Sequence, residues 1–337
     1  MYDRWRRRGM REGELLVLRY HRVIPDDEPE PVYRLGVHRH SFAGQIRHLA
    51  RRARLVDLDG ARAFLAAQDH GPGRRVLVTL DDGYRDNHSE AAPVLRGARV
   101  PAVVFVTTGH VGGARFLWER LKNVVETPGR RELPLPGGEA IRLTASNRTR
   151  RDAFRRLHRW LQSLPARDAE ALLRLWEASG GGSPRNDGPL SWEEVRDLHR
   201  DGIWIGSHTV SHPRLSSLDA ETLRREVTAS RQRLEEELGG AIRSFAYPSG
   251  DLDEHVVMEV KRAGYDIAFT TRPGTNAPGA DPLRVHRKGI AGPSSETPWG
   301  RFSPSLFQAE LSGLYDALLR RAPAIEGGAL RSVRTRG

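Results

Sequence analysis

The chain has 337 residues, 38% of them hydrophobic and 29% charged, so it is long enough to bury the core of one large α/β domain. It contains no cysteine, which excludes a disulfide framework, a thiolate nucleophile and a sulfur-ligated metal, so any metal must be held by His, Asp or Glu. No apolar run approaches the roughly 20 residues that span a bilayer, and the apolar stretch at residues 15–18 is too short for a secretory signal. We therefore expect a cytoplasmic protein with no transmembrane segment.

The formal net charge is +11, and arginine carries nearly all of it, because the chain has only three lysines. Such an excess suits an anionic partner, for example nucleic acid, a phospholipid surface or a substrate that carries phosphate. The arginines are nevertheless spread along the chain in pairs such as Arg51-Arg52 and Arg224-Arg225, a pattern typical of solvated helix faces. Basic residues are not interleaved with aromatic ones over any sustained stretch. We expect no nucleic-acid partner and leave association with a membrane surface open.

Strand and helix patterns alternate along most of the chain. Short apolar runs predict strands, and apolar residues three to four apart predict helices. The expected strands are residues 14–19, 75–80, 101–107, 203–206, 244–247 and 267–270, and the expected helices are 41–54, 91–97, 192–200, 220–238 and 254–263. Repeated strand–helix units imply a parallel sheet or barrel, whose functional site lies at the carboxyl ends of the strands.

Residues 112–188 interrupt this alternation with arginine-rich helical patterns, and we interpret them as a helical insertion closed by a flexible run at 180–183. The helical spacing of its tryptophans, Trp118, Trp160 and Trp176, favours core packing over stacking on sugar rings. Residues 305–319 are a candidate amphipathic helix, and 331–337 a candidate disordered tail. The expected organisation is one domain over residues 1–303 that contains the insertion, followed by a C-terminal helix and tail over 304–337.

Two clusters of chemically capable side chains follow strands of the predicted sheet. Asp81 and Asp82 come directly after the strand at 75–80, and adjacent carboxylates repel each other unless a cation or a proton relieves the repulsion. His208 and His212 follow the strand at 203–206, and two imidazoles at this spacing can converge on one ion. An Asp-Gly turn or a pair of surface histidines explains either cluster alone. Together they predict a divalent metal ion on Asp82, His208 and His212, with coordination positions left open for catalysis.

A site of this kind suits the hydrolysis of an acyl group. A metal on two histidines and a carboxylate polarises the acyl oxygen and makes water more acidic, while Asp81 beside it can act as the general base. The leaving amine then needs a proton from the opposite wall of the cleft, for which His21 and His286 are the candidates. This ligand set accepts zinc, cobalt, nickel or manganese, and we expect one ion per chain, with zinc as the first choice.

Three short motifs carry a family resemblance. TLDDGYRDN resembles the first motif of the polysaccharide deacetylases of the NodB-homology type, also called carbohydrate esterase family four, and SHTVSHP and FAYPSG resemble their second and third. The resemblance covers about residues 14–112 and 188–290 and leaves the insertion outside. It implies an α/β fold, a distorted (β/α)7 barrel, and a reaction in which acetyl is removed from an N-acetylated sugar.

The sequence departs from the family pattern in the third and fifth motifs. Ala246 stands where the family usually has an arginine that orients the base, and Ser249 stands where it has an aromatic residue. We still expect Tyr247 and Ser249 to face the substrate, and the backbone N–H of Ser249 can bind the oxyanion, because that role needs no side chain. The fifth motif is not clear around His286, whereas LRYHRV resembles the Tyr-His segment of circularly rearranged deacetylases. We therefore expect His21, rather than His286, to be the general acid.

The resemblance makes an N-acetylated carbohydrate the expected substrate. A sugar intermediate linked to phosphate or lipid is consistent with a basic protein in the cytoplasm. Two alternatives stay open: an amidase or imidase that acts on a non-sugar substrate with the same fold and metal, and a non-catalytic protein that binds an anionic surface. The oligomeric state is open as well.

Overall fold

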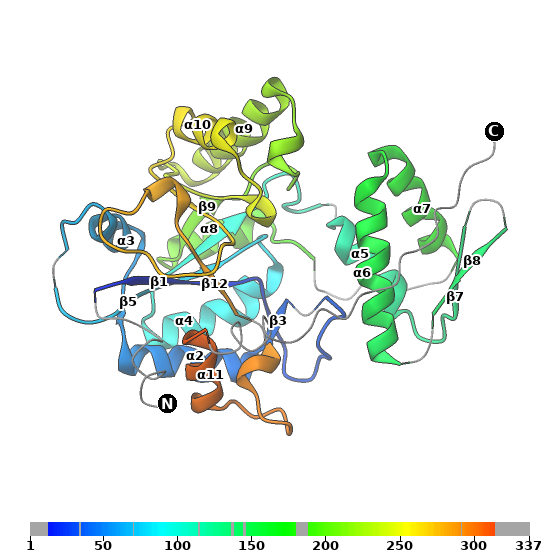
Figure 1. The fold of residues 1–337 in the computed structure, drawn as a ribbon, viewed down its shortest axis with the longest axis horizontal. Coiled ribbons are helices and arrows are strands. Elements are labelled where there is room, and N and C mark those ends of the chain that lie inside the picture. The colour runs from blue at the N-terminus through cyan, green and yellow to red at the C-terminus, as the bar shows by residue number, and fades with distance from the viewer. Residues whose placement is uncertain are drawn as a thin grey trace.

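The computed structural model describes residues 13–33, 35–69, 71–113, 115–135, 138–143, 146–179, 188–290 and 292–313. Seven parallel strands form one curled sheet (Figure 1). Across the sheet they are β11 (Ile267–Phe269), β10 (Ser244–Ala246), β9 (Trp204–Ser207), β6 (Ala102–Val106), β5 (Arg75–Leu80), β1 (Leu15–Tyr20) and β12 (Lys288–Gly289), with β4 (Arg54–Leu55) beside β5.

The two edges of this sheet are joined by the segment that leads into β12. The Val285 N–H donates to the carbonyl of Ala268 at 2.9 Å, and the Val285 carbonyl accepts from the Thr270 N–H at 2.8 Å. Three residues later β12 pairs with β1, and the Ile290 N–H donates to the carbonyl of Arg19 at 2.9 Å. The sheet thus curls back on itself, which confirms the expected distorted barrel of seven strands.

Helices cover the outside of the sheet. They are α2 (Arg39–Arg52), α4 (Ala92–Ala98), α8 (Trp192–Arg200), α9 (Ala220–Leu238), α10 (Glu254–Arg262) and α11 (Pro304–Leu311). Helix α3 (Leu58–Leu65) instead packs against the inner face of the sheet. Local sequence fixes several of their starts: Ser191 and Glu194 form a capping box before α8, and Asp219 and Asp253 cap α9 and α10. The predicted strands and helices of the barrel all lie within two residues of the observed ones.

Short elements complete the barrel. Strands β2 (Arg22–Ile24) and β3 (Gly36–His38) pair with each other, and a π-helix (Asn87–Ala91) precedes α4. Single 3-10 turns lie at Leu215–Ser217, Pro248–Gly250, Pro282–Arg284 and Gly292–Ser295. The sequence analysis missed β2, β3, β4, β12 and α3, which are too short or too weakly periodic to recognise alone.

The core divides into two layers because successive strand residues point to opposite faces. On β1, Leu16, Leu18 and Tyr20 pack against the covering helices, whereas Leu15 and Val17 pack inside the curl with Leu77, Phe105 and Val285 from other strands. Arg19 has the same parity as Leu15 and Val17, so β1 directs it to the inside of the barrel near the carboxyl ends of the strands.

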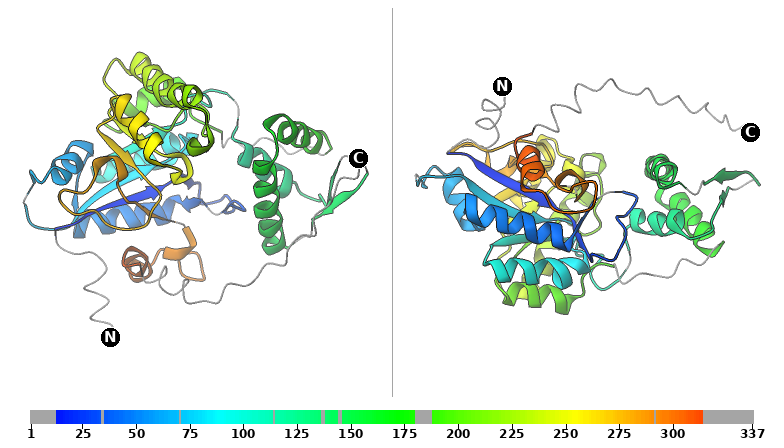
Figure 2. Two further views of the ribbon diagram at one scale, coloured as in Figure 1. Left: turned by 45° about the horizontal axis from the view of Figure 1, so that its top comes forward. Right: turned by 90° about the horizontal axis from the view of Figure 1, so that it is seen from below.

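The insertion forms a separate lobe beside the sheet, as all views in Figures 1 and 2 show. It contains α5 (Leu117–Glu126), a hairpin of β7 (Glu132–Pro134) and β8 (Ala140–Arg142), α6 (Asn147–Ser163) and α7 (Ala166–Ala178). These elements share a hydrophobic core of their own, which includes Leu121, Phe154 and the buried Trp176. The segment is therefore helical as expected, with one hairpin that the sequence did not reveal.

Parts of the predicted C-terminal region lie outside the described residues. Helix α11 covers the start of the helix expected at 305–319, and the description ends at residue 313. The expected tail at 331–337 and the run at 180–183 also lie outside the described residues. No helix within the described ranges is long and apolar enough to cross a bilayer.

Candidate metal centre and active site

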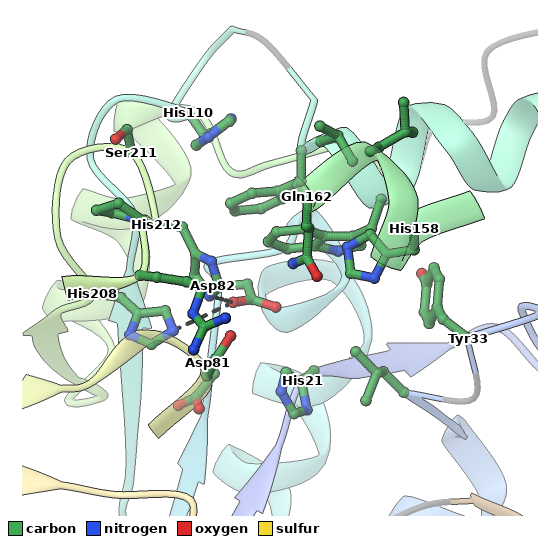
Figure 3. Close-up of a pocket in the computed structure, with 18 of the residues that line it drawn as sticks. His21, Tyr33, Asp81, Asp82, His110, His158, Gln162, His208, Ser211 and His212 are labelled. Carbon is green, nitrogen blue, oxygen red and sulfur yellow. Dashed lines mark ion pairs between the residues drawn. The ribbon is translucent and has the colours of Figure 1, made fainter. Parts of the chain in front are cut away.

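A cavity of about 850 Å³ opens at the carboxyl ends of the strands. Its floor comes from the barrel and includes His21, Asp81, Asp82 and His208. Its far wall comes from the insertion, chiefly from aromatic and polar side chains of α5 and α6 (Figure 3). The cavity therefore lies where a parallel barrel places its functional residues, between the two parts of the domain.

Asp82, His208 and His212 converge on one point of this floor, as Figure 3 shows. The Nε2 atoms of His208 and His212 lie 3.4 and 3.5 Å from Oδ1 of Asp82. These separations exceed those of ordinary N–H···O hydrogen bonds. Two ligand atoms about 2.1 Å from a tetrahedral zinc ion are about 3.4 Å apart, so the observed spacing fits a shared ion.

The backbone at these ligands is unusual. Among the described residues other than glycine, six have positive φ, and four of them lie in the site: Asp82 (75°), Thr209 (67°), His212 (59°) and Ser249 (55°). This conformation costs about 1–3 kcal/mol for such residues and persists only where the surroundings enforce it. Its concentration at the strand ends supports a functional site here.

Polar contacts around the histidines fix their orientation. The Nδ1–H of His208 donates to the carbonyl of Ala246 at 2.7 Å, which leaves the Nε2 lone pair directed at Asp82. Glu226 on α9 accepts from the backbone N–H groups of Val210 and Ser211, both at 2.9 Å, and so holds the loop that carries His212. Burial, followed by the neighbouring His208, lowers the pKa of His212 to about 4. The ring is therefore neutral at pH 7, as a metal ligand must be.

Asp81 is held by an arginine that the sequence analysis did not find. Arg287, which is completely buried, donates from Nη1 to Oδ1 of Asp81 at 2.6 Å and from Nη2 to Oδ2 at 2.7 Å. Its Nε donates to the carbonyl of Thr270 at 2.8 Å. Burial alone would raise the pKa of Asp81, but the charge of Arg287 and then that of His208 hold this pKa well below its usual range. Reading Ala246 as the loss of the orienting arginine was wrong, because a guanidinium reaches Asp81 from the segment before β12 instead.

The two candidate acids occupy different places. His21 follows β1 and lines the cavity, and in Figure 3 the two aspartates lie between it and His208. Burial lowers the pKa of His21 to about 4, against the smaller opposing effect of Asp82. His286 is not among the residues that line this cavity, and its backbone N–H donates to Oδ1 of Asn276 at 2.8 Å.

The two residues expected to face the substrate also differ. Ser249 is exposed and lines the cavity. Tyr247 is buried in the core, where its hydroxyl donates to the carbonyl of Leu283 at 2.9 Å. Its backbone N–H donates to the carbonyl of Phe269 at 3.0 Å. Tyr247 therefore has no polar group directed at the cavity, and the structure does not support a substrate contact for its side chain.

The insertion brings an aromatic wall to the candidate metal ligands. The rings of Phe116 and Trp118 are stacked, with their centroids 4.3 Å apart, and the centroid of the Trp118 ring lies 4.9 Å from that of the His212 ring. Trp118 thus lines the cavity, whereas Trp176 belongs to the core of the insertion as its spacing predicted. Trp160 is 36% exposed and does not line the cavity.

A buried polar network holds this wall in place. The Trp118 Nε1–H donates to the Tyr84 hydroxyl at 2.8 Å, and that hydroxyl donates to Glu119 at 2.9 Å. Glu119 also forms a buried ion pair with Lys122 at 3.0 Å. This network could not be predicted from local sequence, because an acid and a base three residues apart in a helix usually face solvent.

Comparison with known proteins identifies the family. The family model for polysaccharide deacetylase matches residues 68–132 and 153–268, which is more than half of the chain. The chain belongs to the polysaccharide deacetylase family. The match covers Asp81, Asp82, His208 and His212 and includes most of the insertion, which the motifs alone had left outside, whereas His21 and Arg287 fall beyond it.

Individual relatives of this family are distant. YxkH of Bacillus subtilis (strain 168), whose name assigns it to the polysaccharide deacetylases, is 20% identical over 245 residues, or 72% of this chain. The chain spans 62% of the length of YxkH. The deacetylase PplD of Streptococcus pyogenes, solved in complex with acetate, has a TM-score of 0.58 at 16% identity over 88% of this chain and 98% of its own. IcaB from Ammonifex degensii has a TM-score of 0.56 at 23% identity over 89% of this chain and 97% of its own. At these identities the two structures establish the shared fold.

Proposed function

We propose that this protein is a metal-dependent hydrolase that removes N-acetyl groups from a carbohydrate. The observation that carries the proposal is the joint arrangement of Asp82, His208 and His212 at the spacing of a shared ion, next to the Asp81–Arg287 pair on one cavity floor. Membership of the polysaccharide deacetylase family supports the same reaction class.

Each residue has a distinct role in this proposal. A divalent ion on Asp82, His208 and His212, with zinc as the first choice and cobalt, nickel or manganese as alternatives, would polarise the acyl oxygen and make water more acidic. Asp81 is the general base, and the two-pronged contact with Arg287 keeps it ionised and directs its carboxylate. The backbone N–H of Ser249 is a candidate donor to the developing oxyanion.

His21 is the proposed general acid. It lines the cavity on the other side of the aspartates from His208, where a leaving amine can approach it. Because burial lowers its pKa to about 4, His21 is neutral in the free protein at pH 7. It must therefore gain a proton, which water supplies through Asp81, before it can protonate the amine as the C–N bond breaks.

The aromatic wall supports a sugar as the substrate. A flat face such as that of Trp118 suits the apolar face of a sugar ring, and Trp118 lines the cavity beside the candidate metal ligands with the buried Phe116 stacked against it. A phosphate- or lipid-linked sugar and a cytoplasmic location remain hypotheses, to be checked with substrates of each kind and by cell fractionation.

Acetate release from N-acetylated oligosaccharides and from phosphate-linked N-acetyl sugars tests this function. We expect release by the zinc-loaded protein and a loss of at least about 100-fold in Asp81→Asn. Asp69→Asn is the matched control, because Asp69 is also bound by a buried arginine but lies at the opposite end of β5. Metal binding without acetate release from any sugar would instead favour an amide or imide substrate that is not a sugar.

A further inference from the structure

One cation in the cavity floor is not explained by the proposed chemistry. Arg19 on β1 is half-buried and lines the cavity together with His21 and both aspartates. Its Nε is buried and has no hydrogen-bond partner. No hydrogen bond or ion pair joins its guanidinium group to any residue in the part of the chain that the structure describes.

The other arginines at the cavity differ from Arg19 in this respect. Arg287 is paired with Asp81 on the floor. Arg155 and Arg214 are exposed at the rim and face Asp152 and Asp251 at 3.4 and 3.8 Å. Arg19 is therefore less exposed than the rim arginines and, although Asp81 and Asp82 lie near enough to act on its charge, it lacks the direct ion pair that each of the others has.

An unpaired cation in this position is costly to keep. Burial, and after it the charge of Arg287, lowers the pKa of Arg19 to about 10, so the group still carries its charge at pH 7. A neutral side chain of similar length would avoid the desolvation penalty. Such groups in clefts are candidates for function, because a ligand can supply the missing opposite charge.

The charge of the floor points to an anion. Before any ion is bound, the positive charges of Arg19 and Arg287 balance the negative charges of the two aspartates. A divalent ion at Asp82 would therefore leave the floor with an excess of positive charge. The guanidinium is positioned against β12, where Gly289 has no side chain and a Cβ would lie 3.0 Å from Nη2 of Arg19.

We propose that Arg19 binds a small oxyanion, a carboxylate or a phosphate group, on the floor of the cavity. The planar guanidinium matches both groups through two parallel N–H···O contacts. Two sources can supply this chemistry: the acetate that the proposed reaction releases, or an acidic substituent on the sugar itself. The first source depends on the proposed deacetylation, whereas the second does not.

Direct binding tests this inference apart from catalysis. Sodium acetate and inorganic phosphate are titrated into wild type, Arg19→Gln, Arg19→Lys and the rim control Arg214→Gln, each zinc-loaded and chelator-treated, with calorimetry or NMR as the readout. We expect Arg19→Gln to bind at least one of the two anions about tenfold more weakly in both metal states, a loss of about 1.4 kcal/mol. Arg19→Lys should retain part of the affinity, and Arg214→Gln should bind as wild type does.

Thermal unfolding and substrate pairs complete the test. Since Arg19→Gln removes an unpaired charge, its Tm should equal or exceed that of wild type. A lower Tm with unchanged anion binding would show a structural role and overturn the proposal.

The two sources of the anion are separated by comparing product inhibition by acetate with the binding of N-acetylglucosamine and its 6-phosphate. Loss of inhibition alone assigns the product, and loss of the preference for the phosphorylated sugar assigns the substrate. If Arg19→Gln matches wild type in the titrations, in product inhibition and in sugar-phosphate binding, the proposed anion site is refuted. If wild type binds the anion through Arg19 but releases no acetate, only the proposed function is refuted.

Discussion

Replacing Arg287 with methionine should separate the role of the base from that of the metal. Methionine keeps much of the buried volume but removes both contacts to Asp81, at 2.6 and 2.7 Å, and the contact to the Thr270 carbonyl. The perturbation therefore leaves the three proposed metal ligands unchanged and removes the ion pair that holds Asp81.

The expected magnitude follows from burial. Arg287 and Asp81 have side-chain exposures of 0% and 3%, so removal of one partner leaves a buried charge without compensation. Such changes typically cost about 3–5 kcal/mol of unfolding free energy. A base that takes up a proton to escape this cost can no longer accept one from water, so acetate release should fall by about 100- to 10,000-fold. Arg287→Lys should recover little of the activity, because an ammonium cannot reproduce the two parallel contacts.

Urea unfolding, zinc content and acetate release are measured on the same preparations. Arg75→Met is the matched control, since Arg75 is buried and holds Asp69 through contacts of 2.6 and 2.9 Å at the start of β5, remote from the cavity. The control should lose stability but keep zinc and acetate release, whereas Arg287→Met should keep zinc and lose acetate release. Equal activity in the two variants would refute the assignment of Asp81 as an arginine-held base.

Three further changes test other parts of the site and fold. His21→Gln should lower kcat by about 100-fold or more, while His286→Gln should leave kcat near that of wild type. Steady-state kinetics in which only His286→Gln is impaired would reverse the assignment of the acid. Trp118→Ala should raise KM for a sugar substrate about fivefold to tenfold with zinc content unchanged, since one aromatic platform is lost; an unchanged KM would argue against a sugar contact. The hydrogen bond to Glu296 raises the pKa of His38 in the folded protein. The stability that protonated His38 contributes is therefore fully present below the ordinary histidine pKa of about 6.5, and it is lost as pH rises through the raised pKa. His38→Gln should therefore cost more stability at pH 5.5 than at pH 8.5, by about 1 kcal/mol, and a cost independent of pH in urea titrations would contradict this.

Local sequence was sufficient for most of the barrel. Strand β5 is an uninterrupted buried run, and the Asp pair after it marks its carboxyl end. Helices α8 and α9 begin at capping residues that bond to the first turn, Ser191 and Asp219. Because a parallel barrel brings these strand ends together, the candidate metal ligands could be grouped although Asp82 and His208 are 126 positions apart, and their side chains do converge.

The strand that closes the barrel, β12, could not be predicted from local sequence. β12 has two residues, too few for a periodic signal, and its position depends on pairing with β1 across the curl. His286 in this segment was a candidate acid, whereas a role for its neighbour Arg287 was not predicted. Alternation offered a usable signal: an apolar Val285 directed inward implies that Arg287 points inward as well and His286 does not.

The anion-binding Arg19 and the Trp118 wall depended on packing between distant segments. Arg19 looks like an ordinary strand-end arginine until it is known that its buried Nε has no hydrogen-bond partner. Trp118 has helical spacing typical of a core residue, and its contacts with Tyr84 and Phe116 hold it beside the candidate metal ligands. Neither could be inferred from local patterns.

Metal titration with simultaneous detection of acetate tests the central claim most directly. Chelator-treated protein is titrated with zinc, bound ion per chain is measured by mass spectrometry, and acetate release from an N-acetylated oligosaccharide is followed in parallel with Asp82→Asn as the comparison. We predict that acetate release rises with bound zinc and levels off at about one ion per chain, and that Asp82→Asn neither binds this ion nor releases acetate. Full acetate release by the chelator-treated protein, or zinc binding by Asp82→Asn equal to that of wild type, would contradict the account.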